Sequence, residues 1–224
     1  MALVLSHEEQ EQLDALKAWW RANGRLLIVA VSAALVFSLG WNGWQWWRRS
    51  EQVQAAAQAF EAIDQALEKQ AWAEARAAWE RLKAVPWVGK AQAAYAALAI
   101  ADQAAAKNAA AEAIPVVREA GTLGVDDDAV QPLLAFTLAE LHLAQGEYDA
   151  AAKALPQAVP APYQPRLWAL KGDIALAQGE AQQAVSHYDK ALAEVRGDPS
   201  WQMVLRAKRE QAAIASDPVK EPTQ

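Results

Sequence analysis

Three histidines and one run of acidic residues are the side chains in this sequence whose types could support chemistry. His7, His142 and His187 stand far apart in the chain, and none has a neighbour at the spacing of a metal ligand or a catalytic partner. The chain has no cysteine, which excludes disulfides, thiolate metal sites and cysteine nucleophiles. The sequence therefore predicts no enzyme active site, no metal and no cofactor.

The acidic run Asp126-Asp127-Asp128 raises the possibility of a calcium site. Calcium loops space their oxygen ligands along the chain and end on a distal glutamate, and this segment has neither feature. We interpret the run as a solvated turn that places acids ahead of the next helix, where negative charge is favourable.

The charge distribution argues against nucleic acid as a partner. Of the 21 Lys and Arg and the 27 Asp and Glu residues, five and four lie in the first 50 residues, which leaves 16 basic and 23 acidic residues after that point. This part of the chain has a net charge of −7 and no basic stripe that could follow a phosphate backbone. Alanine is prominent among the 54% hydrophobic residues, which favours packed helices.

Residues Leu26–Trp47 form an uncharged apolar stretch that predicts one transmembrane helix. As a helix, this stretch spans roughly 33 Å, which matches the hydrocarbon core of a bilayer. A cleaved signal peptide would have a shorter apolar core and a small-residue cleavage site, and a buried core helix would seldom have arginines at both ends. Tryptophans and arginines gather at the two boundaries and are the predicted membrane-interface residues: Trp19, Trp20, Arg25, Trp41, Trp44, Trp46, Trp47, Arg48 and Arg49.

The segment before the span, residues 1–25, is predicted to be an amphipathic helix. Ser6 and Glu9 have the spacing of a capping box, Asn23-Gly24 ends the helix, and an apolar stripe includes Leu13 and Trp20. The helix either lies on the membrane or a partner, or simply extends the membrane helix. Three basic residues before the span against two after it favour a cytoplasmic N-terminus by one charge.

The rest of the chain is an internal repeat. Leu143–Glu147 (LAQGE) recurs as Leu176–Glu180, a shift of 33 residues, and a shift of 38 residues aligns two weaker copies before them. Small and bulky residues alternate at aligned positions in the pattern of a tetratricopeptide repeat. We therefore predict an all-α fold, with helix pairs at 51–86, 90–121, 129–160 and 164–196, a capping helix at 199–215 and a disordered tail at 217–224. The alternative is an alanine-rich helical bundle with chance periodicity.

An acidic residue follows the small-residue position in every predicted helix pair, and an apolar residue precedes each acid by about one helical turn. First helices line the concave face of such a solenoid, so the two columns predict a binding groove for an extended basic or amphipathic polypeptide. The alternative is a solvated helix face with ordinary charges. The predicted protein-binding residues are the acids Asp64, Asp102, Glu140 and Asp173 and the apolar residues Phe60, Leu98 and Phe136, with Ala169 at the fourth apolar position.

The order of these parts resembles the ancillary SecYEG translocon subunit family of bacteria. The likeness is closest in Gln10–Arg25, a charged helix that ends in two aromatics, a basic residue and Asn-Gly, and in the span that closes with Gly43–Trp47. The repeat region agrees in layout, with residues that are generic to tetratricopeptide-like folds. The tryptophan and alanine content departs from the family pattern.

Membership of that family implies an inner-membrane protein with residues 1–25 in the cytoplasm, a membrane helix at 26–47 and a periplasmic solenoid at 48–216. It implies association with Sec translocon subunits, with a membrane-anchored, prolyl-isomerase-like periplasmic chaperone and with newly translocated polypeptides, in addition to membrane lipid. A structural tether in cell-envelope or division assemblies is the alternative function.

Overall fold

The computed structural model describes residues 37, 38, 40, 41, 44, 47, 51–86 and 88–216. The chain divides into two compact units, residues 1–53 and 54–224. All regular elements of the described residues are helices. The predicted segment 1–25, the tail 217–224 and the predicted interface residues Trp19, Trp20, Arg25, Trp46, Arg48 and Arg49 lie outside the described residues.

In the first unit, the described aromatic residues are helical and share one face. Phe37, Trp41 and Trp44 follow each other at four and three residues, and the ring centroids lie 6.1 Å apart for the first two and 5.5 Å apart for the second two. These three side chains and Trp47 are all exposed. Among the described residues, no helix has both the length and the apolar character needed to cross a membrane. Most of the predicted span 26–47 falls outside those residues.

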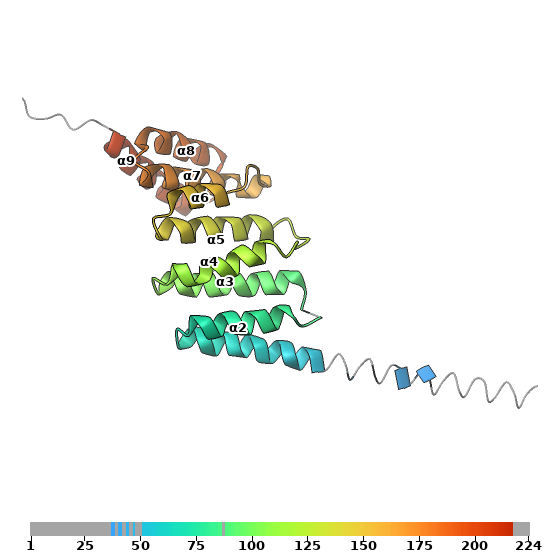
Figure 1. Ribbon diagram of the computed structural model, residues 1–224. Coiled ribbons are helices and arrows are strands. Elements are labelled where there is room, and N and C mark those ends of the chain that lie inside the picture. The colour runs from blue at the N-terminus through green and yellow to red at the C-terminus, as the bar shows by residue number, and fades with distance from the viewer. Residues whose placement is uncertain are drawn as a thin grey trace, which may run out of the picture. The chain divides into compact units, whose positions relative to one another are not determined.

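The second unit is a succession of helices that pack against their neighbours in chain order (Figure 1). The prediction of helix pairs followed by a capping helix is confirmed, and the bounds agree with it except in the third pair, where α6 ends at Ala154 and the predicted pair runs to residue 160. After a helical segment at residues 51–68, the elements are α2 (Trp72–Lys83), α3 (Lys90–Ala106), α4 (Ala110–Gly121), α5 (Val130–Ala144), α6 (Tyr148–Ala154), the 3₁₀ turn η1 (Ala161–Tyr163), α7 (Gln164–Ala177), α8 (Ala181–Glu194) and α9 (Pro199–Ser216).

The turn inside each helix pair has the same backbone conformation. Gln70, Asn108, Gly146 and Gly179 occupy equivalent positions and have φ values of 55°, 57°, 73° and 83°. In each turn the next residue donates its N–H to the carbonyl five positions earlier, as in Glu180 N to Ala175 O at 2.8 Å. This bond and the left-handed residue before it are the features of a Schellman helix ending. The repeat therefore lies in the backbone as well as in the sequence.

Small residues at fixed positions allow the paired helices to approach closely. Ala75, Ala113, Ala151 and Ala184 are equivalent in the four pairs, and all are fully buried. Of the described residues, Trp79 of α2 has the largest fully buried side chain, and its Nε1 donates a 2.7 Å hydrogen bond to the carbonyl of Ala93 in α3. A buried indole with a satisfied N–H stabilises the contact between the first two pairs.

The acidic run at residues 126–128 forms the turn before α5. The carboxylate of Asp127 accepts a 2.9 Å hydrogen bond from the backbone N–H of Ala129, and its carbonyl accepts one from Val130 N at 3.1 Å. Asp126 and Asp128 are exposed. The structure thus agrees with the interpretation of this run as a solvated turn that leads into a helix.

Candidate functional site

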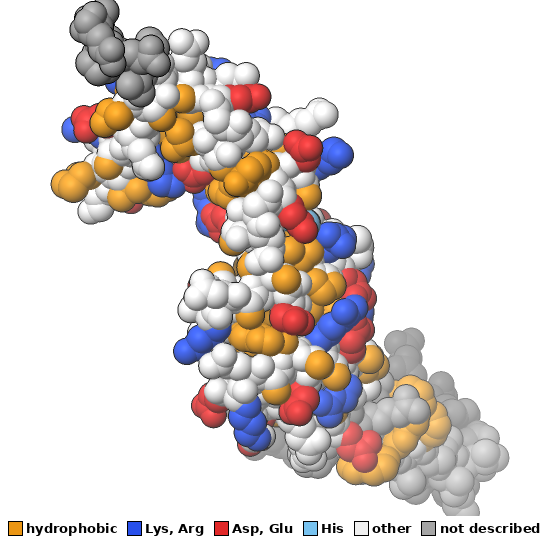
Figure 2. All heavy atoms as spheres, turned by 60° about the vertical axis from the view of Figure 1, so that its left-hand side comes forward, with side chains coloured by type: hydrophobic (Ala, Val, Ile, Leu, Met, Phe, Trp, Pro, Cys, Tyr) orange, Lys and Arg blue, Asp and Glu red, His pale blue; other side chains and the backbone are white. Residues whose placement is uncertain are grey.

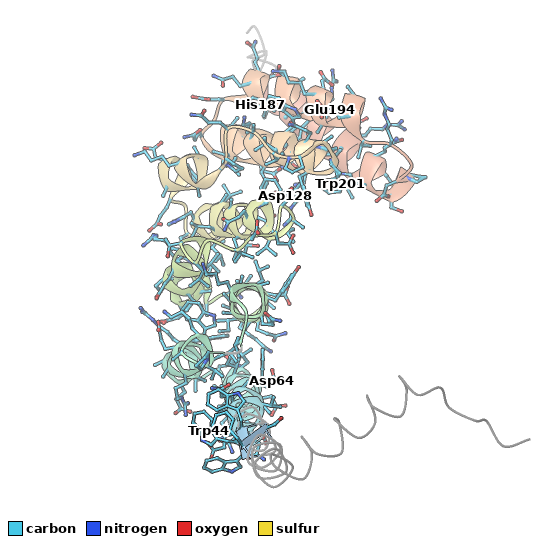
Figure 3. All side chains as sticks on the ribbon, turned by 90° about the vertical axis from the view of Figure 1, so that its right-hand side faces the viewer. Trp44, Asp64, Asp128, His187, Glu194 and Trp201 are labelled. Atoms are coloured by element: carbon cyan, nitrogen blue, oxygen red, sulfur yellow. The ribbon has the colours of Figure 1, made fainter. Side chains whose placement is uncertain are left out.

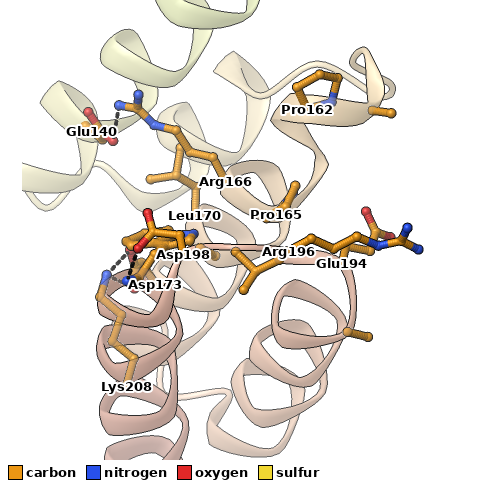
Figure 4. A pocket seen from close by; sticks show the side chains of 15 residues that line it. Glu140, Pro162, Pro165, Arg166, Leu170, Asp173, Glu194, Arg196, Asp198 and Lys208 are labelled. Carbon is orange, nitrogen blue, oxygen red and sulfur yellow. Dashed lines mark hydrogen bonds and ion pairs between the residues drawn. The ribbon is translucent and has the colours of Figure 1, made fainter.

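A groove with a volume of about 1120 Å³ lies beside α7 of the last helix pair and the capping helix α9 (Figure 4). Its walls come from α5, η1 and α7, from the end of α8 and the connection that follows it, and from α9. Apolar side chains on the walls include Pro165, Leu170, Val195 and Trp201. Charged residues of both signs surround them: Glu140, Arg166, Asp173, Glu194, Arg196, Asp198 and Lys208.

Residues at the first turns of η1, α7 and α9 determine where the helices at the two ends of this groove begin. Pro162 and Pro165 lie at the first turns of η1 and α7, where a missing N–H costs nothing. At the other end, the carboxylate of Asp198 accepts a 2.9 Å hydrogen bond from the N–H of Trp201 and so caps the first turn of α9. The half-buried Trp201 ring is therefore held on a defined helical turn.

An ion pair links α5 to α7 at one rim of the groove. Arg166 Nη2 lies 2.9 Å from Glu140 Oε1, and the guanidinium also lies 5.4 Å from the centroid of the Phe136 ring. Both charged side chains are partly exposed. Arg166 neutralises Glu140 at this rim, so the groove is less acidic here than the acid column predicts.

Asp173 anchors the second rim through three hydrogen bonds. Lys208 Nζ of α9 lies 2.8 and 2.7 Å from its two carboxylate oxygens, and the Tyr188 hydroxyl donates to Oδ1 at 2.7 Å. Burial raises the pKa of Tyr188 far above its ordinary value, and the hydrogen bond to the Asp173 carboxylate adds to this effect. The three side chains tie α7, α8 and α9 together beneath the groove.

The structure brings together only part of the predicted protein-binding set. Glu140 and Asp173 line the groove, whereas the other two acids and their apolar neighbours lie on earlier helices. Asp64 and Asp102 are exposed and have no ion pair within the described residues. Phe60 is 38% exposed, Leu98 is half-buried, and Phe136 is fully buried. Figure 3 shows Asp64 apart from the groove residue Trp201, and the predicted acid column along the first helices stays a prediction.

Phe136 is a core residue in this structure. It belongs to a small cluster with Val159, Leu167 and Leu170, and its ring centroid lies 6.4 Å from that of Tyr163. The connection between α6 and α7 folds over it and removes it from solvent. Its side chain therefore contributes to stability and offers no open surface to a partner.

Several groove residues were not identified from the sequence: Arg166, Leu170, Val195, Trp201 and Lys208. The repeat alignment carried no signal for Arg166, because Leu133, Tyr95 and Ala57 stand at the equivalent positions. The predicted capping helix is the one feature of the sequence that indicates Trp201 and Lys208, since a helix that covers α7 and α8 must place one face against them.

His142 and His187 both make contacts with neighbouring side chains of the repeat region. His142 is buried with its Nδ1 2.6 Å from Glu147 Oε2 and its Nε2 3.5 Å from Arg118 Nη2. His187 stacks on Trp168 with the ring centroids 5.7 Å apart. In the part of the chain that the structure describes, no group of three or more His, Asp or Glu side chains is arranged to hold a metal ion.

The repeat region has a mixed surface charge. Figure 2 shows acidic and basic side chains interspersed over one face of the described residues, with apolar side chains between them. A groove with apolar walls and both signs of charge at its rim suits a polypeptide that presents apolar and polar side chains together.

Comparison with known proteins gives one family and several relatives. The family described as "Tetratricopeptide repeat-like domain" matches residues 17–214. A protein of Neisseria gonorrhoeae named "Ancillary SecYEG translocon subunit" is 30% identical over 203 residues, which is 90% of this chain and 95% of the relative. Proteins of the same name from Aggregatibacter actinomycetemcomitans and Haemophilus influenzae are 30% and 26% identical and cover 82% and 84% of this chain, with 88% and 91% of their own lengths aligned.

Proposed function

Because this chain belongs to the tetratricopeptide repeat-like family of ancillary SecYEG translocon subunits, we propose that it is a non-catalytic, protein-binding subunit of the Sec translocon. Its role is to receive newly translocated polypeptides, together with a membrane-anchored, prolyl-isomerase-like periplasmic chaperone. The chain aligns with nearly the full length of the relatives that carry this name.

The proposed location is the bacterial inner membrane, with a cytoplasmic N-terminus and the repeat region in the periplasm. The uncharged stretch Leu26–Trp47 and its flanking arginines support this placement. Trp41, Trp44 and Trp47 are exposed on a helix at one end of that stretch. Indole rings favour the headgroup level of a bilayer, where the ring is buried and the N–H stays hydrated.

The groove beside α7 and α9 is the observation that carries the protein-binding role. A polypeptide that leaves the channel is unfolded and exposes apolar side chains. Weak, reversible binding is enough to shield these side chains from water. The half-buried Trp201 and the adjacent Pro165 offer apolar contact area, while the ion pairs at the rim fix the groove walls. Aromatic side chains in such positions supply much of the energy of protein–protein contacts.

Co-purification of the full chain from membranes tests the proposal. We expect SecYEG subunits to be recovered with the chain after solubilisation in a mild detergent. Recovery of a fixed set of cell-wall or division proteins without the channel would instead establish the structural tether. Trp201→Ala is the matched variant: it should keep the channel subunits and lose the translocated polypeptides, because the groove binds the polypeptide alone.

A further inference from the structure

Four side chains of α7 and α8 form a second cluster, which we call the cationic aromatic cluster: Trp168, Lys171, His187 and Lys190. The Trp168 and His187 rings are stacked with an interplanar angle of 18°. The ammonium groups of Lys171 and Lys190 each lie 4.6 Å from the centroid of the Trp168 ring. Two cations and a histidine thus surround one indole.

Within the described residues, the polar groups of this cluster lack hydrogen-bond and ion-pair partners. Trp168 Nε1 and His187 Nδ1 are buried without a hydrogen-bond partner, although buried polar atoms are almost always paired. Neither Lys171 nor Lys190 forms an ion pair with another described residue, whereas Arg166, Lys208 and Arg209 nearby are all paired with acids. The cluster therefore combines two uncompensated positive charges with an unused indole donor.

The cluster is particular to the last helix pair. Trp168 aligns with Ala135, Ala97 and Ala59 of the earlier pairs, and His187 aligns with Ala154, Val116 and Ala78. Trp168 stands four residues before Gly172, at the tryptophan position of the tetratricopeptide pattern, so repeat packing accounts for the indole. That pattern does not require a histidine stacked on the indole or two lysines beside it.

We propose that the cationic aromatic cluster binds a carboxylate side chain of an acidic polypeptide segment. Lysine ammonium groups and an indole N–H only donate hydrogen bonds, so their complement is a group that only accepts them, such as an ionised carboxylate. The stacked rings offer an apolar surface for the stem of the same side chain. The ammonium groups of Lys171 and Lys190 make the contact with the carboxylate.

An acidic polypeptide fits this cluster better than an anionic membrane surface does. The chain after residue 50 has 16 basic and 23 acidic residues, so a negatively charged bilayer repels the repeat region as a whole. A short segment with one or two carboxylates meets only the local positive charge. The four residues also do not line the groove beside α7 and α9, and Figure 3 shows His187 apart from Trp201. The cluster is therefore a separate site from the proposed groove.

His187 supplies a direct readout of occupancy. Burial lowers the pKa of His187, and the charges of Lys190 and Lys171 lower it further. A carboxylate bound between the lysines offsets their charges and raises the pKa of the imidazole. NMR titration of the His187 ring therefore reports whether an anion has entered the cluster.

The test uses the full chain in a neutral detergent and a dye-labelled peptide of alternating glutamate and leucine. We expect the K171Q/K190Q double variant to bind this peptide at least about tenfold more weakly than the unchanged chain. The matched control K107Q/K153Q removes two exposed lysines on α3's end and α6 and should bind as the unchanged chain does. Circular dichroism verifies that both double variants remain folded.

Three results would overturn the proposal. Equal binding of a peptide with glutamine in place of glutamate would show that the carboxylate is not recognised. An unchanged His187 pKa at saturating peptide would place the peptide elsewhere. Binding to phosphatidylglycerol vesicles that depends on Lys171 and Lys190, without binding of the peptide, would identify a membrane contact. Trp201→Ala separates this proposal from the proposed function: if it abolishes the groove crosslinks but keeps peptide binding, the peptide binds at the cationic aromatic cluster and not in the groove.

Discussion

Gly172 of α7 packs directly on the ring of Tyr188 in α8. A Cβ atom added at Gly172 would lie 2.6 Å from Tyr188 Cε1, which is closer than real contacts of this kind allow. The Tyr188 ring is fully buried, and its hydroxyl is held by Asp173 one residue further along α7. The close approach of α7 and α8 therefore requires glycine at position 172, because the buried Tyr188 ring fills the space that a side chain would need.

Gly172→Ala should destabilise the protein despite the better helix propensity of alanine. Overpacking of a core costs about 1–3 kcal/mol, and the propensity gain of about 0.5–1 kcal/mol offsets only part of that cost. We expect the free energy of unfolding, measured by urea denaturation, to fall by about 1–2 kcal/mol. Gly121→Ala is the control, since a Cβ there meets open space. A Gly172→Ala variant as stable as the control variant would refute the close contact.

The left-handed residues of the turns predict opposite effects on stability for two substitutions. Gln70 and Asn108 adopt a positive φ that Gly146 and Gly179 adopt without steric cost. Gln70→Gly should therefore raise the free energy of unfolding by about 0.5–1 kcal/mol, and Gly179→Ala should lower it by about 1 kcal/mol. Chemical denaturation of the two single variants measures both effects. A loss of stability in Gln70→Gly would contradict the left-handed conformation of that residue.

Tyr188 predicts a loss of stability at high pH. Burial and the Asp173 carboxylate raise the pKa of Tyr188 in the folded chain, whereas the unfolded chain releases this proton near pH 10. The folded state then holds more protons above pH 10, so this stabilising contribution is complete below that pH and declines as the pH rises. Between pH 10 and 11, the free energy of unfolding should fall less steeply in Tyr188→Phe, by up to about 1.4 kcal/mol per pH unit. Parallel slopes in the two proteins would show that the phenol ionises in the folded state.

The two phenylalanines of the predicted apolar column should behave differently. Phe136→Ala removes a fully buried ring and should cost about 3–5 kcal/mol of the free energy of unfolding. Phe60→Ala changes a side chain that is 38% exposed and should cost clearly less. Thermal or urea unfolding of both variants checks this difference. Similar losses in both would mean that Phe136 is not the core residue described above.

The sequence predicts the helix pairs well because their signals are local. The LAQGE element carries the turn in the last two pairs, and the residue aligned with its glycine takes the left-handed conformation in all four pairs. The small positions repeat in register with the turns, which is enough to place each helix against its partner. The membrane span and its interface residues remain predictions, since most of them lie outside the described residues.

The groove could not be predicted because its contacts join distant segments. Arg166 reaches Glu140 across 26 residues and Lys208 reaches Asp173 across 35, and neither separation matches the repeat. Phe136 stands in the apolar column of the first helices, yet Val159 and Tyr163 from an irregular connection cover it. Tertiary packing decides where such a connection lies, and periodicity carries no information about it.

Crosslinking from the groove in intact membranes tests the central claim most directly. A photo-reactive amino acid replaces Arg196, which is exposed and lines the groove, or Gln103, which is exposed on α3 and does not. During active translocation, we expect position 196 to crosslink to varied secreted polypeptides and position 103 to crosslink only weakly. Trp201→Ala should reduce the crosslinks from position 196. Equal crosslinking from both positions, or recovery of a single envelope protein at each, would contradict the proposed function.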